Sequence, residues 1–164
     1  MHKRLMLAAT VAVLAVAGLS IACSNDPTGP APVVFTAALN ATNERQTNPV
    51  NSTATGPATL TLRGGDSLDI TVVATGLTAA AVASHIHVGS TAVSGNIITP
   101  FGITAGVTSG TVVFQTIVLS QVTVGAQQVS GDSVKVLLTN GNAYVNVHTS
   151  TNPGGEIRGQ VVRQ

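Results

Sequence analysis

From residue 33 onward, apolar residues that favour β-strands occur in short runs separated by Gly, Asn, Asp, Ser or Pro. Residues 67–74 show the pattern most clearly, because Leu68, Ile70 and Val72 alternate with polar residues such as Asp69. Successive side chains of a strand point to opposite faces, so this alternation predicts a sheet with one buried face. The sequence therefore predicts an all-β fold, an antiparallel sandwich or barrel of about eight to nine strands.

The expected strands can be placed by the turn residues that separate them. They are residues 33–39, 58–63, 67–74, 84–88, 110–119, 133–138, 143–149 and 156–162, with a further short strand at 96–99. The Gly-Gly-Asp sequence at 64–66 predicts a hairpin turn. In the 133–138 segment, Lys135 is expected to face outward between apolar neighbours. The Ala-rich stretch 77–83 is compatible with one helical turn.

The chain begins with a pattern typical of protein export. Lys3 and Arg4 form a basic start, and residues 5–22 carry no charge. A basic region followed by an apolar one predicts a signal peptide over 1–22. The alternative is an uncleaved membrane helix, because the uncharged stretch is near the lower length limit for crossing a bilayer.

Cys23 is the only cysteine of the chain and follows the apolar stretch directly. The sequence Leu-Ser-Ile-Ala-Cys at 19–23 resembles a bacterial lipobox, although Ser20 stands where that motif usually has Leu. We therefore expect lipid attachment at Cys23, a flexible tether over 23–32 that is rich in small residues and Pro, and one β domain over 33–164. The expected location is the cell envelope, anchored to the membrane; secretion without an anchor is the alternative.

The composition excludes several classes of function. Charged residues make up 8% of the chain, and seven Lys and Arg against six Asp and Glu leave no basic stripe for nucleic acid. No Gly-x-Ser-x-Gly motif is present, and no carboxylate pair typical of a glycosidase is evident. We therefore expect no enzyme activity.

Three of the predicted strands have an unusual polar face. In 84–88, His85 and His87 lie on the face opposite Ile86 and Val88. The segments 143–149 and 156–162 show the same alternation, with polar residues on one face and apolar residues on the other. Together these polar positions form a predicted polar cluster: His85, His87, Tyr144, Asn146, His148, Glu156, Arg158 and Gln160.

A turn-rich segment at 149–155 indicates that the last two strands form a hairpin. The alternation of apolar and polar residues restricts its register, because a slip of one residue places valines opposite charged groups. The predicted opposite pairs are His148 with Glu156, Asn146 with Arg158, and Tyr144 with Gln160.

The same residues resemble a known family. The sequences His-Ile-His-Val-Gly at 85–89, Tyr-Val-Asn-Val-His-Thr at 144–149, and Asn-Pro-Gly-Gly-Glu-Ile-Arg-Gly-Gln-Val at 152–161 are similar to the signature of the CHRD domain. That domain was first described in the developmental antagonist chordin and also occurs singly in bacterial exported proteins. The resemblance covers about 33–164 and departs from the family at 45–49. It implies an extracytoplasmic β domain without a defined biochemical activity.

Three interpretations of the polar cluster remain at this point. Its side chains can join the strands through hydrogen bonds. Alternatively, His85, His87 and His148 can supply three imidazoles to zinc or copper, with Glu156 as a fourth ligand or as the partner that orients His148. Hydrolytic chemistry is the third interpretation, and it lacks the usual motifs.

We therefore predict an exported, membrane-anchored lipoprotein of the CHRD type that acts as a binding or envelope-structural module without catalysis or a cofactor. The long loops 41–56 and 89–110 are expected to face a protein or polysaccharide ligand, and nucleic acid is not expected as a partner. The alternative is a β-sandwich protein that binds zinc or copper through its three histidines.

Overall fold

The computed structural model describes residues 30–121, 123–124 and 127–164. Its strands are β1 (Val33–Asn40), β2 (Thr55–Leu62), β3 (Ser67–Ala74), β4 (Ala81–Val88), β5 (Ile97–Pro100), β6 (Gly110–Val118), β7 (Thr123–Val124), β8 (Gln127–Gln128), β9 (Ala143–Thr149), β10 (Ile157–Gln160) and β11 (Val162–Arg163). Its helices are α1 (Gly131–Thr139) and the short 3-10 turns Ala41–Asn43, Gly64–Asp66 and Leu119–Gln121. Within the described residues the fold is mostly β, as the sequence predicts.

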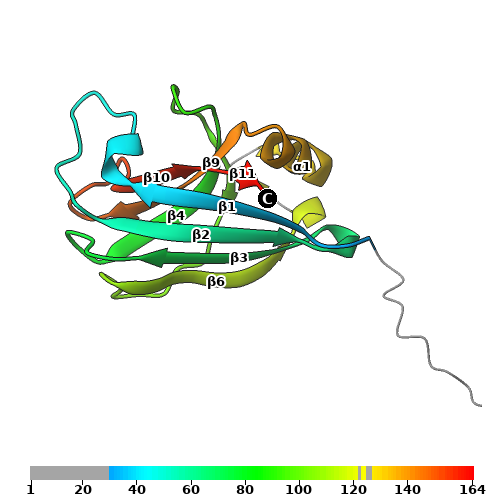
Figure 1. The fold of residues 1–164 in the computed structure, drawn as a ribbon, viewed down its shortest axis with the longest axis horizontal. Helices are drawn as coiled ribbons and strands as arrows, with labels where there is room; N and C mark the ends of the chain where they lie inside the picture. The colour runs from blue at the N-terminus through cyan, green and yellow to red at the C-terminus, as the bar shows by residue number, and fades with distance from the viewer. Residues whose placement is uncertain (1–29, 122, 125–126) are drawn as a thin grey trace, which may run out of the picture.

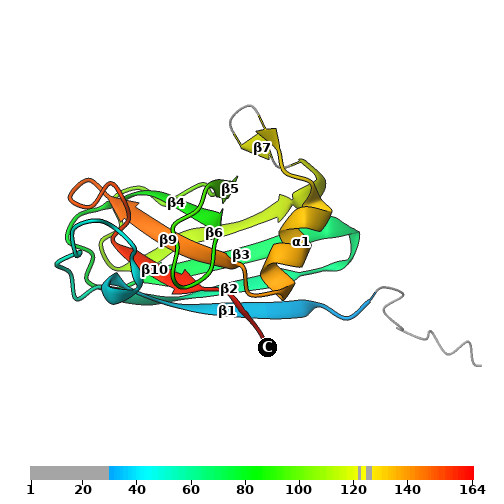
Figure 2. The same cartoon turned by 90° about the horizontal axis from the view of Figure 1, so that it is seen from above.

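One antiparallel sheet forms the body of the molecule. Its strands lie in the order β5-β4-β9-β10-β1-β2-β3-β6, and β11 pairs with β1. The sheet curls, so that β1, β2, β3 and β6 form one layer and β4, β9 and β10 lie behind it (Figures 1 and 2). The segment between β5 and β6 bridges the open side, because Phe101 N donates to Ser84 O and Thr104 N donates to Val112 O. The result is a half-barrel with the apolar core inside the curl.

The core confirms the alternation predicted for β3. Leu68, Ile70 and Val72 are buried, and Val145 and Val147 of β9, in the other layer of the curled sheet, are also completely buried. Burial of such side chains contributes about 1.5–3 kcal/mol each, so this inner face accounts for much of the stability. The predicted hairpin between β2 and β3 is also present.

The prediction of a strand over 133–138 is wrong, because this segment lies in α1. Val134 and Leu138 are buried four residues apart, which is a helical spacing, whereas Val136 is 56% exposed. Ser130 begins the helix, since its hydroxyl oxygen accepts a hydrogen bond from the backbone N–H of Ser133. In Figure 2, α1 lies across one end of the curled sheet, where its apolar side covers the core.

The stretch 77–83 does not form a helical turn either, because its backbone bonds to a distant segment. Leu77 N donates to Thr108 O, and Ala81 N donates to Val107 O and opens β4. Within the described residues, no helix is long and apolar enough to cross a membrane. The predicted signal peptide over 1–22 and the predicted lipid site at Cys23 lie outside the described residues.

Candidate functional site

The sheet places the three polar-faced strands side by side. β9 lies between β4 and β10, and residues of all three strands meet in register. The register is as follows: Asn146 lies opposite both His85 and Arg158, and Tyr144 lies opposite both His87 and Gln160. Two of the three pairs predicted for the last hairpin are therefore confirmed. The position of the β4 histidines beside them could not be inferred from one sequence, because β4 and β9 are distant in the chain.

The three histidines converge on this face. One ring nitrogen of each of His85, His87 and His148 lies within 4.8 Å of the others. The closest pair is His85 Nδ1 and His148 Nε2, which are 3.1 Å apart. Asn146 lies among them, with its Oδ1 atom 3.1 Å from the same His148 nitrogen. The half-exposed rings of His85 and His148 leave one side of the group open to solvent, whereas His87 is buried.

Backbone carbonyls fix the orientation of two of the rings. His87 Nδ1 is 2.9 Å from Gly95 O, and His148 Nδ1 is 2.9 Å from Pro153 O. Because a carbonyl oxygen can only accept, Nδ1 carries the proton in both rings, and Nε2 has a free lone pair. His87 Nε2 is buried and has no hydrogen-bond partner.

The histidines are neutral at neutral pH. Burial, together with the smaller effects of the nearby His148 and His87, lowers the pKa of His85 to about 4. Burial also lowers the pKa of His87 and of His148. Neutral imidazoles can act as hydrogen-bond acceptors or metal ligands, which protonated rings cannot.

Arg158 and Tyr144 form a stack that covers one side of the histidines. The Tyr144 ring lies parallel to the His87 ring with 4.8 Å between centroids, and the Arg158 guanidinium lies 3.4 Å above the centroid of Tyr144. Arg158 is 1% exposed and donates hydrogen bonds to Ser90 O at 2.7 Å and Val93 O at 2.8 Å. It therefore combines a cation–π contact with charge-assisted hydrogen bonds to the 89–96 loop.

Gln160 lies two residues after Arg158, on the same face of β10, and binds the same loop. Its side-chain amide donates to Gly89 O at 2.8 Å and to Gly141 O at 2.7 Å. Arg158 and Gln160 thus fix both the start and the middle of the 89–96 loop to the sheet.

Glu156 lies apart from the histidines, contrary to its predicted role beside His148. The carboxylate is completely buried and accepts five hydrogen bonds: from Ser52 Oγ, Thr78 N, Thr78 Oγ1, Thr149 Oγ1 and Asn152 Nδ2. Burial acts to raise its pKa, but these donors outweigh burial and lower it. Gly155, with φ of 124°, directs the chain just before Glu156, and Pro153 rather than Glu156 orients His148.

Glu44 is a second acidic group of this region that the strand pattern does not reveal, because it lies in a loop. Its carboxylate lies against Gly155, and its Oε1 atom is buried without a hydrogen-bond partner. Burial raises the pKa of Glu44 to about 7, although the charge of Arg158 opposes the shift. The two glutamates therefore differ in state: the buried Glu156 is ionised and fully bonded, and the partly buried Glu44 is poorly solvated.

We expect Glu44→Gln to remove a pH dependence of stability. Below its ordinary pKa of 4.5, Glu44 is protonated in both the folded and unfolded states. Between pH 4.5 and about 7 the unfolded carboxyl ionises first, so wild-type stability falls as the pH rises. The free energy of unfolding of the variant minus that of wild type should therefore increase by about 2–3 kcal/mol over this window.

Urea unfolding measured at pH 4.5, 6 and 8 checks this expectation. The three histidines titrate in both proteins, so their contribution cancels in the difference. A difference that stays constant with pH would show that Glu44 ionises normally in the folded state.

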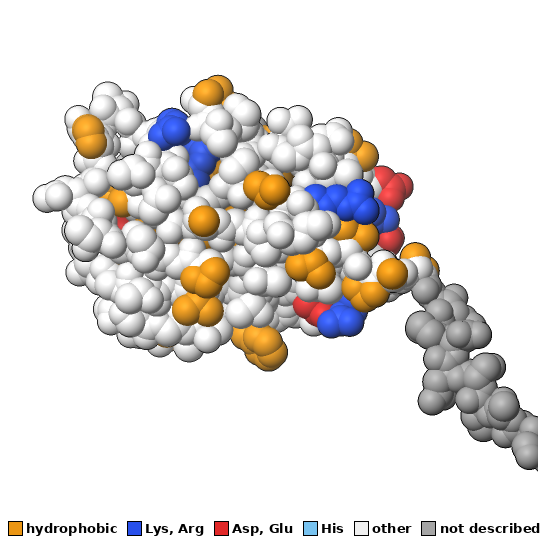
Figure 3. Space-filling model, in the orientation of Figure 1, with side chains coloured by type: hydrophobic (Ala, Val, Ile, Leu, Met, Phe, Trp, Pro, Cys, Tyr) orange, Lys and Arg blue, Asp and Glu red, His pale blue; other side chains and the backbone are white. Residues whose placement is uncertain are grey.

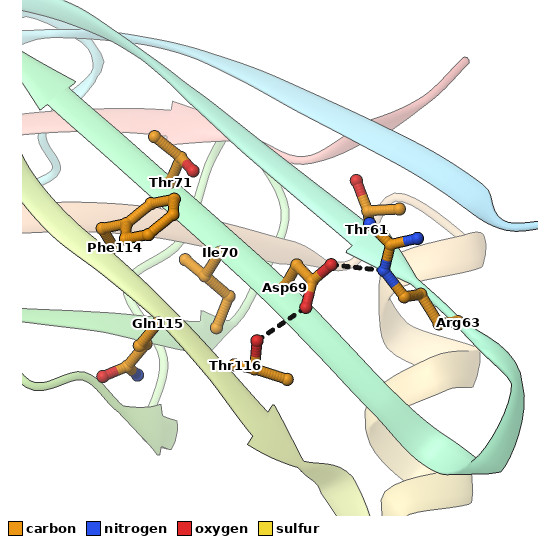
Figure 4. Close-up of a pocket in the computed structure, with 8 residues that line it drawn as sticks. All are labelled: Thr61, Arg63, Asp69, Ile70, Thr71, Phe114, Gln115 and Thr116. Atoms are coloured by element: carbon orange, nitrogen blue, oxygen red, sulfur yellow. Dashed lines mark hydrogen bonds and ion pairs between the residues drawn. The ribbon is translucent and has the colours of Figure 1, made fainter.

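A shallow hollow on the outer face of β2, β3 and β6 is a separate feature (Figure 4). Its charged groups bind each other: Asp69 pairs with Arg63 and accepts a hydrogen bond from Thr116 at 2.7 Å. Phe114 projects beside them and is 83% exposed. Figure 3 shows apolar side chains scattered among polar ones on one face of the molecule rather than in a continuous patch. These features indicate ordinary solvated surface.

Comparison with known proteins agrees with the resemblance in the signature segments. Residues 35–161 match the family model of the CHRD domain, which is more than half of the chain. No curated protein matches the chain, and no solved structure does. The chain belongs to the CHRD domain family.

Proposed function

We propose that this protein is an exported, lipid-anchored CHRD domain that presents two rigid loops to a ligand of the cell envelope and performs no catalysis. The proposal rests on the segments to which the signature residues of the hairpin between β9 and β10 bind. Glu156, Arg158 and Gln160 are each bonded to segments outside β9 and β10.

The 41–54 loop is fixed to the same hairpin. Asn43 Nδ2 donates to Arg158 O at 3.0 Å, Gln46 Nε2 donates to Gly155 O at 2.6 Å, and Ser52 Oγ donates to Glu156. In Figure 1 this loop lies at the end of the sheet opposite α1. A loop fixed in this way loses little conformational entropy on binding, which favours affinity.

The two loops are also bonded to each other. Arg45 Nε donates to Thr91 O at 2.7 Å, and Ser94 Oγ donates to Arg45 O at 2.9 Å. Their outer surface is exposed and carries few charges, with Val93 53% exposed beside small polar residues. This surface suits a protein or polysaccharide ligand rather than a nucleic acid.

The surroundings of the histidines support a role without catalysis. Within the described residues, their ring nitrogens contact each other, Asn146 and two backbone carbonyls, and none hydrogen-bonds to a hydroxyl or a carboxylate. A catalytic triad requires a nucleophile within hydrogen-bond reach of its base.

The sequence of the first 32 residues supports export and anchoring. A basic start, an uncharged stretch and Cys23 follow one another in the order of a lipoprotein signal, and a Pro-rich tether comes next. Stable membrane attachment requires two lipid chains or a second signal, so a doubly acylated Cys23 would suffice.

Cys23→Ser is therefore expected to release the protein from membranes. We expect wild-type protein, expressed from the full chain in a bacterial host, to sediment with membranes, and the variant to appear in the soluble exported fraction. Mass spectrometry of the mature wild-type N-terminus should find an acylated cysteine. Ser24→Ala serves as the matched control and should sediment like wild type.

The released Cys23→Ser protein also tests the ligand. It should co-sediment with isolated envelopes from which lipid has been extracted, and replacement of residues 90–94 by Gly and Ser should abolish this binding. The same Cys23→Ser protein carrying Phe114→Ser, a change on the distant outer face of β6, should bind as before. A mature wild-type protein whose Cys23 is not acylated would refute the anchor, and equal binding by the loop variant would refute the loop surface.

A further inference from the structure

We infer that His85, His87 and His148 form a binding site for a transition-metal ion, Zn²⁺ or Cu²⁺. The site lies on the polar face shared by β4 and β9, and it is independent of the proposed membrane anchor. Four observations support it: the spacing of the nitrogens, the fixed orientation of the rings, an unsatisfied nitrogen and the type of ligand atoms available.

The spacing fits a metal ion after a small adjustment. Zinc–nitrogen bonds of about 2.0–2.1 Å place two ligands of a tetrahedral site about 3.3 Å apart. The nitrogens of His85 and His148 are 3.1 Å apart, and all three ligand nitrogens lie within 4.8 Å. A movement of at most about 1.5 Å therefore brings the widest pair to coordinating distance.

The rings of His87 and His148 are oriented as metal-binding histidines usually are, by a hydrogen bond from the ring nitrogen that does not face the ion. Metal-binding histidines usually donate their second ring N–H to a carbonyl or carboxylate, which directs the other nitrogen to the ion. His87 does this through Gly95 O and His148 through Pro153 O. Both carbonyls belong to loops that the hairpin residues hold in place, so the two nitrogens are oriented in advance.

Hydrogen bonding among the histidines alone leaves the group unsatisfied. A proton on His85 Nδ1 satisfies the nitrogen of His148, but His87 Nε2 stays buried without a partner. Unsatisfied buried polar atoms are rare in folded proteins and destabilise them by about 1–3 kcal/mol each. An ion bound by all three rings removes this cost.

The ligand atoms select the kind of metal. Three neutral imidazoles suit Zn²⁺ and Cu²⁺, whereas Ca²⁺ and Mg²⁺ require oxygen ligands. Glu156 is occupied by its five donors, and Oδ1 of Asn146, 3.1 Å from His148 Nε2, is an additional oxygen close to the group. Because His85 and His148 are half-exposed, water can also reach a fourth position. Tyr144 is stacked on the ring of His87.

The test is metal binding by the purified full chain after treatment with a chelator. Zn²⁺ and Cu²⁺ are titrated separately, each as the metal alone and in competition with a chromophoric chelator. We expect one ion per chain, and we expect His85→Gln and His148→Gln each to weaken binding at least a hundred-fold. Asp132→Asn, which changes an exposed carboxylate near Asp66 and Lys135, is the control and should bind like wild type.

Electron paramagnetic resonance of the Cu²⁺ complex provides a second readout that needs no variant. Hyperfine coupling from imidazole nitrogens should be present in wild type, and thermal unfolding confirms that each variant is folded. Absence of bound metal, binding that survives both histidine changes, or a Cu²⁺ signal without nitrogen coupling would overturn the inference.

Discussion

Glu156→Gln is expected to lower the free energy of unfolding by about 3–5 kcal/mol. The carboxylate accepts five hydrogen bonds and is completely buried. Glutamine has nearly the same shape, but its NH₂ group would face the hydroxyl and N–H donors of Thr78, Thr149 and Asn152. The loss would be a large part of the total stability of a domain of this size. Urea unfolding followed by far-UV circular dichroism measures it, since the chain has no tryptophan.

Glu44→Gln is a matched control for this change. The same chemical substitution is made at a second carboxyl of the region, but one whose pKa burial raises to about 7 and whose Oε1 atom has no partner. At pH 8 we expect it to be neutral or stabilising, because it removes a poorly solvated charge. If both variants lose equal stability, the hydrogen bonds of Glu156 do not account for its effect.

Arg158→Met is expected to lower the free energy of unfolding by about 2–4 kcal/mol and to loosen the 89–96 loop. Methionine fills similar space but removes the donors to Ser90 O and Val93 O and the cation–π contact with Tyr144. Amide hydrogen exchange should accelerate at least about ten-fold in residues 89–95 before any change in the core, because this loop opens locally. Exchange followed by mass spectrometry resolves the two regions.

Arg63→Met serves as the control for loss of an arginine. Arg63 pairs with Asp69 on the outer surface, where its side chain is 56% exposed. Such surface ion pairs contribute up to about 1 kcal/mol, so this variant should keep normal exchange in the 89–96 loop. Unchanged loop exchange in Arg158→Met would contradict the assignment of Arg158 as the residue that fixes this loop.

Much of the fold follows from local pattern. Alternation predicts β3 with its correct bounds, and parity predicts the register in which Asn146 faces Arg158. Both signals are local, because a strand shows its buried face in its own sequence and a short hairpin restricts its own pairing. The wrong prediction of a strand at 133–138, which lies in α1, also comes from reading local pattern alone. Val134 and Leu138 fit a helical spacing, but the segment is short, and short apolar runs do not distinguish a helix from a strand.

The arrangement of the site depended on information that is not local. His85 and Asn146 are neighbours only because β4 adds to the edge of β9, and one sequence does not state which strands pair. The direction of the Glu156 carboxylate depends on donors as distant as Ser52 and Thr78, which parity cannot reveal. The partial burial of Glu44 beside the site does not follow from its sequence, because a loop residue carries no periodic signal.

In the structure, the residues of the predicted polar cluster fall into two groups according to the strand that carries them. The β10 residues Arg158 and Gln160, with Glu156 just before them, bind loops, and the histidines of β4 and β9 face one another. The two parts are connected, because Gly95, whose carbonyl orients His87, belongs to the 89–96 loop that Arg158 and Gln160 fix. The 89–96 loop thus takes part in the orientation of His87.

Anomalous X-ray diffraction from crystals of the protein grown with Zn²⁺, and separately with Cu²⁺, tests this division most directly. We expect one anomalous peak between the rings of His85, His87 and His148, with Glu156 still bonded to Thr78 and Thr149 away from the ion. A map without a peak among the three rings, or an ion held by Glu156, would contradict it.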